Sequence, residues 1–238
     1  MLFLHQICRM VEDSRPLIII TARIGSSRLP GKVLRPFWKD YSLLEFLIRR
    51  LQARPETSRR TLATIDNSEN DAVAALGTSL GVKVVRGPED NVVARMKMCL
   101  QDEDVHYVAR VTADNPFTDP ELFVLQLNEM IRIGADYSYC HETPKGTAAD
   151  IWTMDCFKET VAKASTKYEL EHANAWVWDH PDCYKMLWFV PPKPYAGPEL
   201  NLSIDTENDF IRVCTYADRF ANPLVADISS INLVVGID

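Results

Sequence analysis

A short apolar run that leads directly into a cationic loop constrains this chain more than any other feature. Residues 17–20 (Leu-Ile-Ile-Ile) are typical of a buried strand, and residues 21–32 continue as Thr-Ala-Arg-Ile-Gly-Ser-Ser-Arg-Leu-Pro-Gly-Lys. Gly25 and Gly31 permit left-handed backbone and close approach of a ligand, so that successive N–H groups can point at one anion. The loop also carries three cations: Arg23, Arg28 and Lys32. This combination favours binding of a nucleotide triphosphate.

The loop differs from a P-loop in spacing and in its last residues. A P-loop has four residues between its first glycine and its Gly-Lys pair, followed by Ser or Thr for Mg²⁺. Here five residues separate Gly25 from Gly31, and Val33, which has no hydroxyl, follows the lysine. We therefore exclude a P-loop. A plain glycine turn with solvated cations remains the alternative.

Length and charge limit the classes of protein to which the chain can belong. A chain of 238 residues can form one sizeable core, and we predict a single domain at 17–220. Its two parts are a nucleotide-binding half (17–134) and an acceptor and dimerisation lobe (135–220). Residues 1–16 are then an N-terminal extension, and residues 221–238 are a C-terminal tail. The formal net charge of −7 disfavours nucleic acid as a partner, whereas a nucleotide needs only a few local cations.

The N-terminal residues and the cysteines indicate a cytoplasmic protein. Met1–Leu4 is apolar, but no basic region precedes it and His5 interrupts it, so we expect neither a signal peptide nor a membrane span. The six cysteines form no C-x-x-C pair, which favours free thiols in a reducing compartment over a zinc site.

Alternating apolar and amphipathic stretches predict alternating strands and helices. Strands are expected at 17–22, 61–65, 82–85, 105–109, 137–140, 151–153, 184–190 and 202–204. Helices are expected at 43–51, 69–80, 90–100, 119–133, 155–164, 168–179 and 206–217. Ser42 and Ser68 are expected N-caps, and Gly81 and Gly134 are expected helix ends. The apolar run 231–235 is expected to add an edge strand or to pack on a partner. The pattern predicts an α/β fold with a mostly parallel central sheet, helices on both faces and a smaller mixed lobe.

Candidate functional residues follow four of the predicted strands. The cationic loop follows the first strand, and Asp66, Arg86 and Asp114 follow later ones. Ligands of such sheets bind beyond the carboxyl ends of the strands. We therefore expect these segments to converge at one edge of the sheet.

The loop closely resembles the signature A-R-x-G-S-x-R-L-P-G-K of the sugar-activating cytidylyltransferases. Among these, the chain is most similar to the spore coat polysaccharide biosynthesis group, which is related to the acylneuraminate and 3-deoxy-manno-octulosonate cytidylyltransferases. Further matching segments occur in the same order, at residues 63–67, 85–90 with Arg95, 110–116, 171–172 and 204–209. The resemblance covers residues 17–217. It implies a Rossmann-like, GT-A-like nucleotide-diphospho-sugar transferase fold, CTP as substrate, Mg²⁺ as cofactor and a homodimer.

Nucleotidyl transfer requires neutralisation of phosphate charge, and the loop offers the groups for it. We expect Arg23, Arg28 and Lys32 to bind the triphosphate and, with Asp114, to be catalytic. The backbones of Ala22, Gly25 and Ser26 would add N–H donors. The resemblance implies that Asp66, Asn67 and Arg86 hold the cytosine and ribose, with Arg95 orienting the loop beside the base. From the residues alone, Asp66-Asn67 is equally a plain turn.

Two aspartates are the expected metal ligands. Asp114 is placed as the family places its metal aspartate, and Asp205 would supply a second carboxylate to Mg²⁺, which takes few protein ligands. The alternative for Asp114 is a turn residue before Asn115-Pro116. The alternative for Asp205 is ordinary capping of the helix that follows.

The acceptor side is defined least by the sequence. Arg110, His141, Lys145 and His172 are the candidates for a small anionic acceptor, with Glu171 beside them. In the family group residues 144–150 usually follow P-[RK]-G-x-D-x-E, whereas this chain has Ala148 and Asp150 at the two acidic positions. That departure leaves open a sugar acid, a sugar phosphate, or a small phosphonate or phosphate.

Two other classes of protein compete with a Mg²⁺-dependent cytidylyltransferase. A GT-A-type glycosyltransferase would use a nucleotide sugar and usually an Asp-x-Asp motif, which we do not find in a strand context. A non-catalytic CTP-binding homologue would bind CTP without releasing pyrophosphate.

Overall fold

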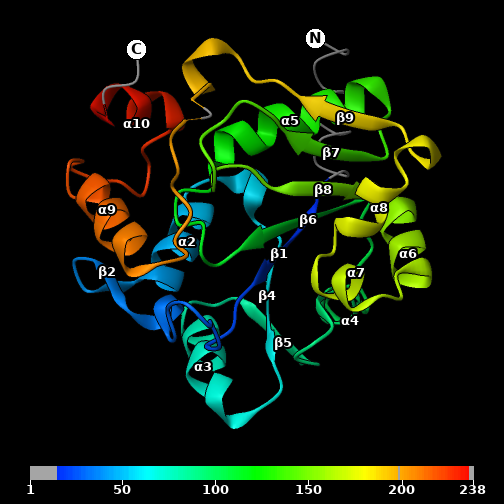
Figure 1. Cartoon of the computed structure of the whole chain (residues 1–238), viewed down its shortest axis with the longest axis horizontal. Coiled ribbons are helices and arrows are strands. Elements are labelled where there is room, and N and C mark those ends of the chain that lie inside the picture. Colours follow the sequence, from blue (N-terminus) through cyan, green and yellow to red (C-terminus); the bar gives the residue numbers. More distant parts are fainter. Residues whose placement is uncertain (1–14, 198, 236–238) are drawn as a thin grey trace.

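The computed structural model describes residues 15–197 and 199–235, and the predicted extension lies outside this part of the chain except for Arg15 and Pro16. Its centre is a seven-stranded sheet in the order β5-β4-β1-β6-β8-β7-β9, in which β8 is antiparallel and the other strands are parallel (Figure 1). The strands are β1 (Leu17–Thr21), β4 (Arg60–Ile65), β5 (Lys83–Gly87), β6 (Tyr107–Thr112), β7 (Tyr137–Cys140), β8 (Asp150–Thr153) and β9 (Met186–Phe189). The sheet contains strands from both predicted halves, and the α/β prediction is confirmed.

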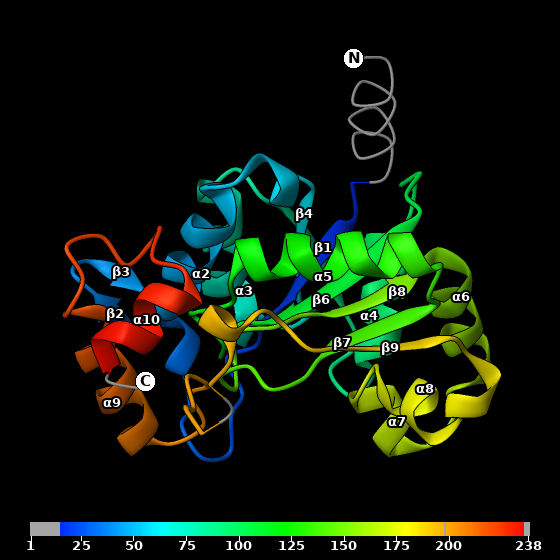
Figure 2. The same cartoon turned by 90° about the horizontal axis from the view of Figure 1, so that it is seen from above.

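Helices cover both faces of the sheet because the central strands are apolar on both sides. Ile18 and Ile20 of β1 pack with α2 (Leu43–Gln52), α3 (Asp71–Ser79) and α5 (Pro120–Ile133). Leu17 and Ile19 face the other way, toward α4 (Val92–Cys99), α6 (Met154–Lys163) and α8 (Ala175–Asp179). Figure 2 shows α5 on one side of the sheet and α4, α7 (Lys167–Glu171) and α8 on the other. This arrangement explains the unbroken apolar run that opens the sequence.

A third apolar cluster lies beside the sheet and contains the C-terminal part of the described chain. The hairpin of β2 (Pro36–Trp38) and β3 (Tyr41–Ser42) packs there with α9 (Glu207–Ala217) and α10 (Ile228–Val235). Phe37 lies edge-on to Phe46, Phe117 and Phe210. Short 3-10 turns complete the described chain: η1 (Lys32–Leu34), η2 (Pro55–Thr57), η3 (Ser68–Asn70), η4 (Pro181–Cys183) and η5 (Lys193–Tyr195).

Several helix ends form as the sequence predicts. The Ser42 hydroxyl accepts from the backbone N–H of Glu45, and Asp119 accepts from those of Glu121 and Leu122. Gly81 and Gly134 have positive φ values of 71° and 64° after α3 and α5. These residues satisfy backbone groups that a helix end leaves unpaired.

The start of α3 differs from the prediction. Ser68 is not its N-cap, because the side chain of Asn67 accepts from the backbone N–H of Asn70 and starts the short turn η3 instead. The expected strand 105–109 begins later, as β6.

The second half departs further from the prediction. The helix expected at 168–179 is interrupted, because His172 takes extended dihedrals and Ala173 is buried in the core. The expected strand 202–204 is an extended segment outside the sheet. Its Leu202 and Ile204 N–H groups bond to the carbonyls of Lys145 and Asp114. The apolar run in the tail forms the helix α10, not an edge strand, and it packs on the body of the same chain.

The cysteines and the helices add two further observations. The five described cysteines are free, and burial raises the pKa of the Cys99, Cys140 and Cys156 thiols to about 12. None of the helices in the described ranges combines the length and apolar character needed to cross a bilayer.

Candidate active site

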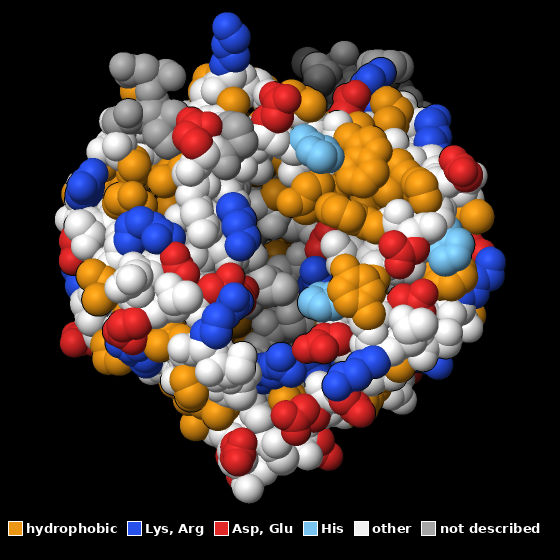
Figure 3. Space-filling model, viewed as in Figure 1, with side chains coloured by type: hydrophobic (Ala, Val, Ile, Leu, Met, Phe, Trp, Pro, Cys, Tyr) orange, Lys and Arg blue, Asp and Glu red, His pale blue; other side chains and the backbone are white. Residues whose placement is uncertain are grey.

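The two central strands place the candidate catalytic segments side by side. β1 and β6 pair in parallel, with Thr21 opposite Thr112, so the loops that follow them leave the same edge of the sheet. Asp205 reaches this edge from far along the chain, because the Ile204 N–H bonds to the Asp114 carbonyl over 2.9 Å. Figure 3 shows a hollow at the centre of this face, bordered by cationic and acidic side chains.

Lys32 lies between the two predicted metal ligands. Its Nζ is 3.1 Å from Asp114 Oδ2 and 3.7 Å from Asp205 Oδ1, and it donates to the Ile204 carbonyl over 2.6 Å. Gly31, with φ 71°, turns the chain into η1 and so aims Lys32 inward, where the residue is 8% exposed. Both carboxylates are about 30% exposed and reach the same point from different segments.

The other loop cations also contact carboxylates from the second half of the chain. Arg28 Nη2 is 2.9 Å from Asp205 Oδ1, and Arg23 Nη2 is 3.4 Å from Glu171 Oε1. Lys145 Nζ is 3.7 Å from Asp205 Oδ2. Four cations thus pair with three carboxylates. A bound triphosphate can take the place of the carboxylates beside the cations, and a metal ion can take the place of the cations beside the carboxylates.

The donor set fits a hard divalent cation. Asp114 and Asp205 can share one ion with phosphate oxygens and water, which is how Mg²⁺ is usually held. The described residues contain no cluster of three or more His, Cys, Asp or Glu suited to a metal, so the phosphates would have to complete the shell. The capping alternative for Asp205 does not apply, because Thr206 and Asp209 form the capping box of α9.

A smaller cavity of about 390 Å³ lies beyond the ends of β4 and β5. Asp66, Asn67 and Arg86 line it. Arg86 is held by Asp71 at 2.7 Å and by Asp66 at 3.4 Å, and it donates to the Asn67 carbonyl. The cavity is of a size that suits one nucleoside.

Arg95 supports the loop of Pro88 and Glu89, which lines the same cavity. It is buried and donates to the Glu89 carbonyl over 3.0 Å and to that of Pro88. Burial lowers its pKa from the usual arginine value. A Cβ at Gly87 would lie 2.8 Å from Arg95 Cγ, so only glycine leaves room for this arginine, a requirement that the sequence analysis missed.

Arg110 takes part in a buried cluster of its own. Its guanidinium is 2.9 Å from Asp150 Oδ2, while Tyr137 donates to Asp150 Oδ1 and Trp178 Nε1 donates to the Tyr137 hydroxyl over 2.8 Å. Burial raises the pKa of Tyr137 well above its usual value. Ala148 packs against an apolar cluster. Ala148 and Asp150, the two positions that depart from the family pattern, therefore add no unpaired carboxylate to the site.

The remaining acceptor candidates lie in two groups. Lys145 and His141 come from the connection between β7 and β8, and His141 contacts the ring of Trp188. His172 follows α7 and contacts Tyr168. The structure therefore brings Lys145 next to Asp205 and leaves the two histidines in separate aromatic surroundings.

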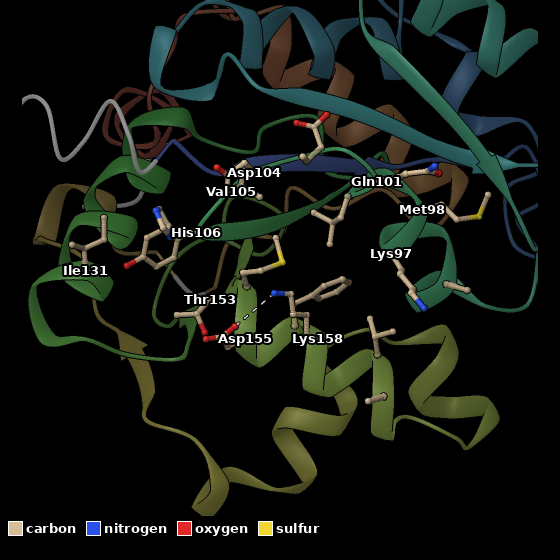
Figure 4. Close-up of a pocket in the computed structure, with 18 of the residues that line it drawn as sticks. Lys97, Met98, Gln101, Asp104, Val105, His106, Ile131, Thr153, Asp155 and Lys158 are labelled. Carbon is tan, nitrogen blue, oxygen red and sulfur yellow. Dashed lines mark ion pairs between the residues drawn. The ribbon is translucent and has the colours of Figure 1, made fainter.

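A second cavity, of about 1860 Å³, lies where β6 begins, at the opposite edge of the sheet (Figure 4). Val105, Phe157 and Val161 give it apolar walls, and Asp155 and Lys158 form an ion pair of 3.9 Å at its rim. None of the predicted site residues lines it. We therefore do not assign the active site to this cavity, although it is larger than the cavity beyond β4 and β5.

The chain is similar to known proteins in both sequence and fold. A family model described as cytidylyltransferase matches residues 17–214. The spore coat polysaccharide biosynthesis protein SpsF of Bacillus subtilis is 30% identical over 200 residues, which are 82% of this chain and 82% of SpsF.

Solved structures share the fold. A cytidylyltransferase from Leptospira borgpetersenii has a TM-score of 0.87 at 21% identity, covering 93% of this chain and 94% of its own. A CMP:2-keto-3-deoxy-manno-octonic acid synthetase complexed with CTP has a TM-score of 0.64 at 15% identity, covering 86% of this chain and 99% of its own.

Proposed function

The chain belongs to the cytidylyltransferase family, which moves CMP from CTP, and from that premise we propose that its acceptor is a small anion and its metal Mg²⁺. The observation that carries the proposal is the position of Lys32 between Asp114 and Asp205. Besides one another, these three groups contact the Ile204 carbonyl and two exposed cations, Arg28 and Lys145. They lie at the edge of the sheet where nucleotide ligands of such folds bind.

In the proposed reaction an acceptor oxygen attacks the α-phosphorus of CTP. The bond between that phosphorus and the oxygen leading to the β-phosphorus breaks, and pyrophosphate leaves with this oxygen. Lys32, Arg23 and Arg28 stabilise the charge that the leaving group gains. The N–H groups of Gly25 and Ser26 add donors from the loop, whereas the expected donor at Ala22 is already bonded to the Ala63 carbonyl over 3.1 Å. Mg²⁺ held by Asp114 and Asp205 would neutralise phosphate charge and align the reacting groups.

Selectivity for cytidine would arise in the cavity beyond β4 and β5. Asp66 and Asn67 offer side-chain groups to the nucleoside, and Arg86 is fixed beside them by two acidic partners. Arg95 keeps the loop of Pro88 and Glu89 in place beneath the base. The nucleoside would therefore bind a preformed surface.

The acceptor would bind between Lys145 and the two histidines, His141 and His172. Lys145 offers a cation for the acceptor charge beside Asp205. Arg110 is engaged by Asp150, so we assign it to the support of this region. The name of SpsF refers to a spore coat polysaccharide, which makes sugar acids and sugar phosphates the first acceptors to test.

A homodimer would form through the exposed aromatic side chains beside the edge strand β9. Trp178 and Trp188 are about 40% exposed, and their rings pack against each other and against Tyr139. Exposed aromatic clusters of this kind are typical of interfaces.

The first experiment is a pyrophosphate-release assay with Mg²⁺ and each of CTP, UTP, ATP and GTP. Pools of sugar acids, sugar phosphates and phosphonates serve as acceptors. We expect release that requires both CTP and one pool. Preference for another nucleotide would contradict the assignment of the cavity. CTP binding without release from any anionic pool would contradict the proposed acceptor class.

A further inference from the structure

The C-terminal helix α10 has a buried polar side chain that the reaction does not use. Ile228 and Ile231 face apolar clusters, whereas Asn232, 6% exposed, lies beside them. Its Nδ2 donates to the carbonyls of Pro194 and Ala196, over 3.2 Å and 2.5 Å. The two bonds satisfy the buried Nδ2 group, whereas Oδ1 is buried without a hydrogen-bond partner. Because a buried N–H group is costly unless it is bonded, this pair of bonds fixes where the segment after β9 lies.

That segment runs from its contact with α10 to the active site. We call residues 193–197 and 199–205 the strap. Gly197 N–H bonds to the Glu142 carbonyl, and the Lys145 N–H bonds to the Leu200 carbonyl over 2.8 Å. Leu202 N–H returns a bond to the Lys145 carbonyl, also over 2.8 Å, before the strap ends at Asp205. The strap therefore sets the backbone of Lys145 and the position of Asp205 together.

The tail itself is tied to the body by buried charged groups. Asp119 Oδ2 accepts from the Ile228 N–H over 2.7 Å, while its other oxygen caps α5. The fully buried Arg50 donates to the carbonyls of Ala226 and Pro223. These bonds lie just before and at the start of α10, and together with the two bonds of Asn232 they give the helix one register against the body.

We propose that α10 is a positioning element of the active site, which acts through Asn232 on the strap and thereby on Asp205. The inference rests on the proposed roles of Asp205 and the metal. Gly197 supports it from the strap side: its φ is 157°, and a Cβ there would lie 3.1 Å from Asn232 Oδ1. A larger residue at position 197 would therefore crowd Asn232. The family match ends at residue 214, so α10 lies beyond the part of the chain that matches the family.

The test uses the full chain and compares two kinds of CTP affinity. Asn232→Leu keeps the bulk of the side chain and removes both bonds to the strap. CTP affinity is measured by calorimetry with Mn²⁺ and again in EDTA, well below the unfolding temperature. We expect about tenfold weaker binding with Mn²⁺, the equivalent of roughly one to two hydrogen bonds, and less than a twofold change in EDTA. In EDTA the nucleotide contacts the loop and the nucleoside cavity, which α10 does not support.

Two further variants control the experiment. Leu233→Ala, at a side chain that is 78% exposed on the same helix, should change neither affinity. Gly197→Ala perturbs the same contact from the strap and should reproduce the metal-dependent loss, which also covers the case in which Asn232→Leu fails to fold. Amide hydrogen exchange should be faster at residues 199–205 in both Asn232→Leu and Gly197→Ala, and unchanged in α9.

The outcomes separate the inference from the function on which it rests. Equal affinities for Asn232→Leu and the unmodified chain, or equal losses with and without Mn²⁺, would overturn the positioning role. Loss of thermal stability without any change in metal-dependent binding would do the same. If the unmodified chain binds no CTP in either condition, the proposed function fails instead.

Discussion

Two clusters of carboxylates and cations in this protein use the same residue types in opposite ways. Around Lys32, Asp114 and Asp205 the carboxylates are about 30% exposed, and they contact cations alone. Around Asp150 the carboxylate and Tyr137 are buried and the Arg110 side chain is 14% exposed, and Arg110 and Tyr137 occupy both carboxylate oxygens. The first cluster can exchange its partners for a metal and phosphates. The second cannot, because its groups already satisfy one another inside the protein.

The comparison shows that burial, more than charge or the number of partners, distinguishes a ligand site from a structural cluster, because Asp205 has three cationic partners and Asp150 has two partners. Asp205 can leave Arg28 and Lys145 at a modest cost, since these exposed ion pairs contribute little to stability. Removing a partner from Asp150 would leave a buried charge alone, which is costly. The two clusters should therefore respond differently to mutation, one in activity and the other in stability.

The largest expected effect is on stability, from Asp150→Ala. The change leaves the Arg110 guanidinium and the Tyr137 hydroxyl buried without their acceptor, and we expect a loss of about 3–5 kcal/mol in the free energy of unfolding. Urea denaturation followed by circular dichroism measures it. Asp155→Ala, at an almost fully exposed side chain, is the control and should stay within about 0.5 kcal/mol. Similar small changes for both variants would show that the Asp150 cluster is not structural.

Lys32→Met should have the opposite profile. The methionine keeps the length of the side chain but removes the charge that faces the phosphates, and we expect pyrophosphate release to slow by about 10²–10³-fold. The unfolding temperature should change little, because the two neighbouring carboxylates remain partly solvated. Lys97→Met, on the surface of α4, is the matched control. A near-normal rate for Lys32→Met would remove this lysine from the proposed mechanism.

The sequence predicts the first half of the fold well because its signals are local. The apolar run at 17–20 requires two covered faces, and Ser42, Gly81 and Gly134 act within a few residues of their own position. The convergence of Lys32 and Asp114 also follows from local patterns, since both come after strands that pair in parallel.

The second half depends on contacts between residues far apart in sequence, which no local pattern contains. Leu202 and Ile204 look like a strand, but the carbonyls of two distant loops accept their N–H groups. Arg110 looks like an acceptor ligand until Asp150 is seen beside it, with Tyr137 on the second carboxylate oxygen. The pairing of Arg23 with Glu171 is likewise visible only in three dimensions.

A smaller effect is expected where a loop cation contacts a carboxylate outside the metal site. Glu171→Gln removes the acidic partner of Arg23, so CTP should bind about two- to fivefold more tightly, the equivalent of one exposed ion pair. Calorimetry at low salt measures the change, which should shrink as salt rises. Glu129→Gln, which disrupts the exposed pair with Arg132, should leave affinity unchanged. Weaker binding would mean that Glu171 supports the nucleotide site.

The smallest effect concerns acid stability at the start of α9. Asp209 accepts from the hydroxyl of Thr206, from Arg212 and from the N–H groups of Thr206 and Asp205, and although burial opposes ionisation, these bonds lower its pKa to about 2. The unfolded chain takes up this proton first, so the stabilisation is complete above about pH 4 and is lost as pH falls toward 2.

Asp209→Asn should therefore reduce stability at pH 6 and make its decline between pH 4 and pH 2 less steep. Urea midpoints at pH 6, 4 and 3 measure both effects, with Asp218→Asn at the exposed far end of α9 as the control. Because Asp209 also holds the Asp205 N–H, the same variant should weaken metal-dependent CTP binding more than metal-free binding. A loss of stability with no such difference would place Asp209 with the Asp150 cluster, as a structural group, and would leave Asp205 positioned by the strap alone.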